Sequence, residues 1–109
     1  MQEASSKALA TGSYDLVALH MLSGGPAYVY EMIRQISELT NYTVCWREGT
    51  AYRLLHDLER RGLVRSAWQG PSEGRQRRYY QLTARGQRAL RQRRHQWRDF
   101  RDTLDKLLE

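Results

Sequence analysis

Between Trp46 and Leu82 the spacing of apolar residues changes from a helical to an alternating period. The stretch WREGTAYRLLHDLERRGLV has apolar residues at i, i+3, i+4 and i+7, the stripe that an amphipathic helix buries. These residues are Ala51, Leu54, Leu55 and Leu58. Gly62 follows, where a helix often ends with a left-handed residue. The chain must therefore fold as a helix that leads directly into β-structure.

The alternating stretch predicts a β-hairpin. Residues 63–68 are typical of a strand, residues 69–74 of a turn rich in Gly and Pro, and residues 77–82 of a second strand. Alternate side chains of a strand point to opposite faces, so Arg77 and Arg78 cannot both face one partner. For the same reason one of Tyr79 and Tyr80 should lie in the core.

Two further helices are expected before this unit. The first covers residues 14–22, with Ser13 as its cap, and ends at the Ser-Gly-Gly-Pro stretch that follows. The second covers about residues 27–39, and residues 40–45 connect it to the third. One face of the second helix carries Val29, Met32, Ile33 and Ile36.

A last helix is expected to begin after Thr83, its cap, and to reach the C-terminus. About 25 helical residues are about 38 Å long, more than a core of this size can cover. The uncovered apolar residues should form a dimer contact, as a small domain gains stability from a partner subunit. The residues expected in this contact are Leu90, Trp97, Phe100, Leu104, Leu107 and Leu108.

The order of these elements predicts a mainly α chain with a β-hairpin wing, in the α+β class. Its architecture is a winged helix-turn-helix with a long C-terminal dimerisation helix. We expect residues 1–13 to be a tail or weak helix, residues 14–82 the winged domain, and residues 83–109 the dimerisation helix.

Charge indicates the partner. Lys and Arg total 18 against 12 Asp and Glu, a net charge of +6 that favours a polyanion. The third helix opens with small Gly49 and carries outward arginine, so its N-terminal end suits the major groove of double-stranded DNA. The residues expected to contact DNA are Arg47, Thr50, Tyr52, Arg53, Arg75, Arg77 and Arg78. By contrast, we expect Arg88, Arg91, Arg93 and Arg94 to form a solvated face.

Several classes of function are disfavoured. The single cysteine excludes an internal disulfide, and no apolar run is long enough to span a membrane, so a cytoplasmic protein is expected. The three histidines have no metal-ligand spacing and no arrangement with an acid and a nucleophile, so we expect no enzyme, metal or cofactor. Cys45 is interpreted as a small buried hydrophobic residue rather than a redox sensor.

Four segments in this order, GPAYVYEMI, EGTAYRLLHDLERRGLV, GRQRRYYQLT and ARG, resemble the PadR family of bacterial transcriptional regulators. The resemblance implies a homodimeric winged-helix repressor of the short subfamily, which dimerises through its C-terminal helix. Two positions depart from the family pattern: Val29 stands where glycine is usual, and Arg53 where proline is usual. Arg53 therefore suggests an operator preference particular to this chain.

Two alternatives remain open. In some PadR relatives an aromatic residue at the place of Trp97 lines a cavity between subunits, so Trp97 and Phe100 could hold a planar aromatic effector. The other interpretation of Trp97 is an interface anchor. The second alternative is a protein-interaction module that kept the winged fold and does not bind DNA, which the basic wing disfavours.

Overall fold

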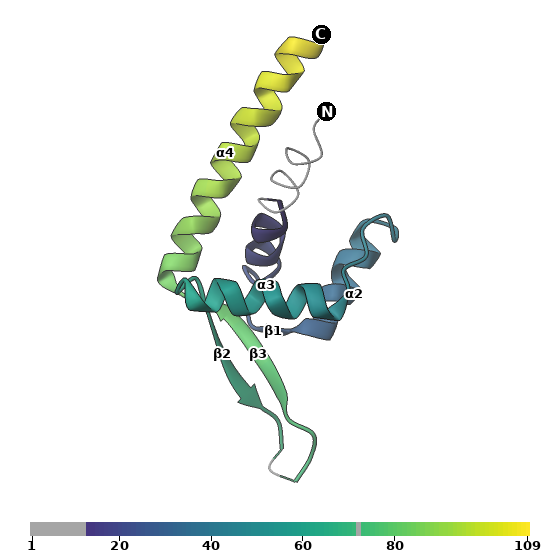
Figure 1. The fold of residues 1–109 in the computed structure, drawn as a ribbon, viewed down its shortest axis with the longest axis vertical. Helices are drawn as coiled ribbons and strands as arrows, with labels where there is room; N and C mark the ends of the chain where they lie inside the picture. Colours follow the sequence, from purple (N-terminus) through teal and green to yellow (C-terminus); the bar gives the residue numbers. More distant parts are fainter. Residues whose placement is uncertain (1–12, 72) are drawn as a thin grey trace.

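The computed structural model describes residues 13–71 and 73–109, and the expected N-terminal tail lies almost entirely outside them. The winged α+β architecture is confirmed (Figure 1). Residues 13–21 are helical. The elements that follow are β1 (Ala27–Tyr28), α2 (Val29–Leu39), α3 (Glu48–Arg60), β2 (Val64–Gln69), β3 (Arg77–Leu82) and α4 (Ala84–Leu108).

The three strands form one antiparallel sheet in the order β1-β3-β2. The hairpin of β2 and β3 is the predicted one, and its register pairs Val64 with Leu82 and Gln69 with Arg77. Strand β1 was not predicted, since its two residues were assigned to the second helix. They pair instead with Tyr79 and Tyr80, more than fifty positions later in the chain. Such a pairing depends on the free edge of β3, which no local sequence pattern reveals.

The core lies where the three N-terminal helical segments meet the base of the sheet. Both predicted stripes face it: Val29, Met32 and Ile36 are buried on α2, while Ile33 is half-buried. On α3 the buried residues are Ala51, Leu55 and Leu58, and Leu54 is half-buried. Tyr80 is the wing tyrosine that reaches the core, as one of the two had to.

Three local expectations before α3 are wrong. Ser13 is already helical and so does not cap the first helix. Helix α3 begins at Glu48, and Trp46 lies before it with its ring 5.2 Å from that of Tyr14. Cys45 is exposed, because Trp46 takes the core position and the Cys45 thiol instead lies beside the carbonyl oxygen of Tyr42.

Helix α4 leaves the domain on the side away from the wing, so the two project in opposite directions (Figure 1). Thr83 caps it as predicted, accepting a hydrogen bond from Gly86 N at 3.0 Å. Within α4 the buried residues are Gly86 and Leu90. Leu90, expected on the dimer contact, therefore belongs to the core of its own chain. No helix among the described residues is long and apolar enough to cross a membrane.

Candidate nucleic-acid interface

The first turns of α3 present an open surface. Arg47 occupies the N-cap position without a side-chain cap, so backbone N–H groups of the first turn remain available to an anion. A Cβ added at Gly49 would meet no atom within 4 Å, so a phosphate has room to approach there. Arg53 is exposed and Thr50 half-buried. Their placement agrees with a contact surface on this side of the helix.

A groove of about 660 Å³ separates α3 from the wing. It brings together four of the predicted residues, Tyr52, Arg75, Arg77 and Arg78, and does not include Arg47, Thr50 or Arg53 among its walls. The complete lining is Tyr28, Val29, Tyr30, Glu48, Tyr52, Trp68, Arg75, Gln76, Arg77 and Arg78. Aromatic rings and guanidinium groups therefore share one recess beside the exposed face of α3.

The two adjacent arginines of β3 have different environments. Arg78 Nη2 lies 3.2 Å from Glu59 Oε1, and its Nε donates to Ser66 Oγ at 3.0 Å. Arg77 instead holds its guanidinium 4.5 Å above the ring of Tyr28. Arg77 is exposed and Arg78 half-buried, so Arg77 is the more accessible to a ligand.

Glu59 joins α3 to both wing strands. Its Oε2 accepts hydrogen bonds from Ser66 N at 3.1 Å and Ser66 Oγ at 2.7 Å on β2, while its Oε1 pairs with Arg78 on β3. Burial raises the pKa of the Tyr80 phenol beneath this cluster. The carboxylate thus joins the wing to the C-terminal half of α3.

The sequence analysis missed the aromatic walls of the groove. Tyr30 and Trp68 are 61% and 64% exposed, which is high for side chains of this size. Trp68 stands opposite Arg78 in the hairpin register, so the alternation of the strands was the signal that could have placed it beside the wing arginines. These rings can stack against sugars or bases, as aromatic side chains do in nucleic-acid sites.

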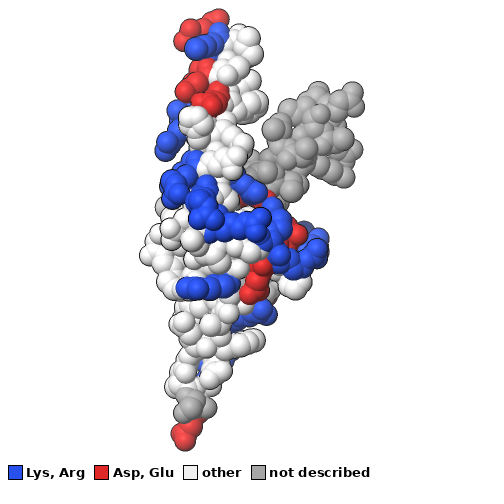
Figure 2. Space-filling view, turned by 90° about the vertical axis from the view of Figure 1, so that its left-hand side faces the viewer, with Lys and Arg blue, Asp and Glu red and all other residues white. Residues whose placement is uncertain are grey.

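Lys and Arg side chains also gather around the base of α4, on the face shown in Figure 2. Arg88 and Arg91 are exposed, as expected of a solvated face. Arg93 and Arg94 are half-buried instead, because Arg93 pairs with Asp15 and Arg94 Nη2 lies 2.6 Å from His20 Nδ1. For these two residues the expectation is wrong, since both cover the helix of residues 13–21.

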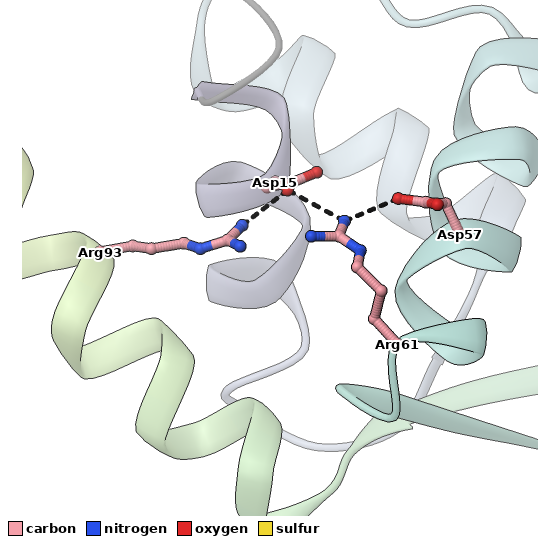
Figure 3. A network of polar contacts seen from close by, with 4 residues as sticks. All are labelled: Asp15, Asp57, Arg61 and Arg93. Atoms are coloured by element: carbon pink, nitrogen blue, oxygen red, sulfur yellow. Dashed lines mark hydrogen bonds and ion pairs between the residues drawn. The ribbon is translucent and has the colours of Figure 1, made fainter.

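Asp15 is the centre of an ion-pair network (Figure 3). Its Oδ2 accepts from Arg93 Nη1 at 2.7 Å and from Arg61 Nη2 at 3.0 Å. Arg61 Nη2 also lies 2.7 Å from Asp57 Oδ2. Burial lowers the pKa of Arg61, but the hydrogen bond and charge of Asp15, together with Asp57, outweigh it and raise the pKa. The network joins the first helix, the end of α3 and α4.

Beyond Leu90 the apolar face of α4 lies open. Trp97 and Phe100 are 47% and 48% exposed, and Leu104, Leu107 and Leu108 continue the same face. Trp97 also lines a second cavity, of about 410 Å³, between α4 and the helix of residues 13–21. Phe100 is not part of its walls.

The winged-helix fold with this groove defines a class of regulator, and comparison with known proteins gives the family. Residues 18–92 match the model of the transcriptional regulator PadR-like family, so the chain belongs to that family. Membership also confirms that it is not an enzyme.

Solved structures show how far the likeness extends. A PadR-like transcription factor from Bacteroides fragilis is 25% identical, with a TM-score of 0.81 over 96% of this chain and 99% of that one. A PadR family regulator from Eggerthella lenta is 33% identical, with a TM-score of 0.72 over 97% and 92%. PadR of Bacillus subtilis, solved in complex with operator DNA, is 19% identical and shares the fold, with a TM-score of 0.65 over 77% and 45%.

Glu59→Gln tests the attachment of the wing. The amide cannot pair with Arg78 as the carboxylate does, so we expect the free energy of unfolding to fall by about 1.5–3 kcal/mol, as for hydrogen bonds to charged groups. Urea denaturation measures this loss. The control is Glu38→Gln, which removes an exposed pair with Arg34 and should cost about 0–1 kcal/mol. Equal losses in the two variants would contradict the role given to Glu59.

Proposed function

We propose that this chain is a homodimeric, sequence-specific DNA-binding repressor. The observation that carries the proposal is that the wing arginines Arg75 and Arg77 line an open groove against Tyr52 of α3, while Arg53 is exposed on the same helix next to Tyr52. A winged-helix protein uses such a helix in the major groove. Its chromosomal partner would place the protein in the cytoplasm.

The parts of this surface have separate tasks. Arg53, on the exposed side of α3, reads a base edge, with guanine its best partner because two acceptors match the guanidinium fork. Thr50 makes a shorter contact on the same side. Arg47 and the wing arginines bind phosphates, which gives affinity and salt dependence without sequence information. Tyr52 adds an aromatic ring to the groove, between the base-reading residues of α3 and the phosphate-binding arginines of the wing.

Two supports come from outside the groove. The chain shares its fold with a protein that has been solved on operator DNA. The open apolar face of α4 is continuous from Trp97 to Leu108, the kind of surface that a second copy covers in a two-fold dimer. A dimer would bind a pseudo-palindrome whose half-sites lie about 10 base pairs apart.

Arg53→Ala is the direct test of base recognition. We expect binding to the preferred DNA, beginning with the chain's own upstream region, to weaken by about 1–3 kcal/mol, while binding to random DNA changes little. Fluorescence anisotropy at several salt concentrations measures both. Arg77→Ala should instead weaken both DNAs alike and reduce the salt slope by about one.

Arg88→Ala is the matched control, because it removes an exposed arginine of α4 that is not part of the groove lining. This variant should keep the preference for the specific DNA over random DNA, and it should change the salt slope by less than one unit. An Arg53→Ala variant that lost the same affinity for both DNAs would contradict base reading by Arg53.

Phe100→Glu tests the dimer. A carboxylate on the open face of α4 would be desolvated in a two-fold contact, so we expect the variant to sediment as a monomer at concentrations where the natural chain is a dimer. His95→Glu, which places the same group on another face of α4, should remain a dimer. A natural chain that sediments as a monomer would refute the proposed assembly.

A ligand-responsive regulator is the second candidate, favoured by the cavity beside Trp97. Leu16 and Val17 supply apolar walls, and Arg94 and Arg98 stand at its edge. A flat aromatic compound could stack on the indole there. Its binding would alter the contact between α4 and the first helix, and so the DNA affinity of the dimer.

Tryptophan fluorescence tests this candidate. An aromatic compound bound in the cavity should quench the emission of Trp97, and the quenching should disappear in Trp97→Phe but persist in Trp68→Phe. A panel of planar aromatic compounds supplies the probes. Quenching that survives in Trp97→Phe, or none at all across the panel, would leave Trp97 as an interface anchor only.

A further inference from the structure

Asp15 connects the helix that would read DNA to the helix that would dimerise. Its carboxylate is 11% exposed and lies between Arg61, at the C-terminal end of α3, and Arg93, in the third turn of α4 (Figure 3). One oxygen, Oδ2, accepts from both guanidinium groups. The first helix therefore serves as a bridge between two elements that project in different directions.

The other contacts leave the direction of α4 only partly fixed. Gly86 and Leu90 are its buried residues, and both lie in its first two turns. Arg93 stands one turn beyond Leu90, where α4 begins to leave the core. Among the described residues, the other polar link at this level joins half-buried Arg94 to the exposed ring of His20. Among the described residues, the pair of Arg93 with buried Asp15 is thus the outermost shielded ion pair between α4 and the rest of the domain.

A small change of that angle has a large effect at distance. Helix α4 has 25 residues and is about 38 Å long, so a rotation of about 10° at its base moves its far end by about 6 Å. This displacement is close to the rise of two base pairs, since each contributes about 3.4 Å. In a two-fold dimer the same rotation changes the separation of the two α3 helices.

We propose that Asp15 is a positioning residue that sets the half-site spacing of the operator, by locking α4 to α3 through Arg93 and Arg61. The inference rests on the proposed DNA-binding dimer. It adds a specificity determinant that touches no DNA: Arg53 selects the bases within a half-site, and Asp15 selects the distance between half-sites.

The chain's single cysteine provides a probe that needs no mutation. Cys45 is exposed and lies three residues before α3, so a spin label on its thiol reports the position of that helix. Pulsed electron–electron double resonance on the labelled dimer, without DNA, gives the distribution of distances between the two Cys45 labels. We expect one narrow distribution for the natural chain.

Two variants that change the net charge in opposite directions separate the loss of the Asp15–Arg93 contact from a general effect of charge. Asp15→Asn raises the net charge by one and Arg93→Gln lowers it by one, yet both should broaden or displace the distance distribution by about 6 Å, the displacement that the length of α4 gives for a rotation of about 10°. Arg88→Gln is the matched control, since it removes an exposed arginine from roughly the opposite face of α4 and should preserve the distribution. If Asp15→Asn fails to fold, Arg93→Gln carries the test, because Asp15 keeps its bond to Arg61.

The second measurement is affinity for a series of DNAs that differ only in the spacing of two half-sites. The natural chain should prefer one spacing over a spacing two base pairs away by about tenfold, and Asp15→Asn and Arg93→Gln should lose most of that preference while still binding. Variants that melt at lower temperature but keep both the distance distribution and the spacing preference would overturn the inference and leave a purely structural role. A natural chain that binds none of the DNAs would refute the proposed function itself, and the distance measurement would still decide whether Asp15 positions the helices.

Discussion

One backbone junction fixes where every functional part of this chain points. At the end of α3 the chain turns through Gly62, whose φ of 77° suits glycine, and Leu63 N bonds back to Leu58 O at 3.0 Å. The carbonyl oxygens of Gly62 and Leu63 then accept from the side chain and backbone of Thr83, at 2.7 and 3.1 Å. Gly86 lies so close that a Cβ there would overlap Leu63 O. The recognition helix, the wing and α4 all leave from this point.

Around the junction, two carboxylates hold the projecting parts in addition to the apolar core. Glu59 ties the wing to α3, and Asp15 ties α4 to α3 through the first helix. Each carboxylate is partly or largely shielded from water and pairs with arginine from another element. Removing one partner of such a pair therefore leaves an uncompensated charge. Within residues 13–71 and 73–109, the exposed arginines Arg53 and Arg75 have no such ion pair and Arg77 stacks on Tyr28, so a polyanion can approach them.

Periodic features of the sequence predicted most of the fold. The stripes around Val29 and Leu55, the switch of period after Gly62 and the cap at Thr83 all depend on local spacing, and the structure agrees with them. What failed depends on contacts between distant segments: strand β1 on the far edge of β3, Cys45 displaced by Trp46, and Leu90 drawn into the core. Arg93 was assigned to a solvated face, because its partner lies 78 positions away at Asp15. Of the residues predicted to contact DNA, the wing arginines and Tyr52 share a groove. Trp68 could have been placed beside them from the alternation of the strands, whereas Tyr30 left no local pattern.

We propose, as the central claim, that the exposed side of α3 and the wing beside it bind double-stranded DNA as one half of a two-fold dimer. Selection of binding sites from random duplex DNA by the full chain tests it most directly. The account predicts enriched sequences that contain two inverted half-sites about 10 base pairs apart, one for each recognition helix. A pool that shows no enrichment over its starting composition, even at low ionic strength, would contradict it.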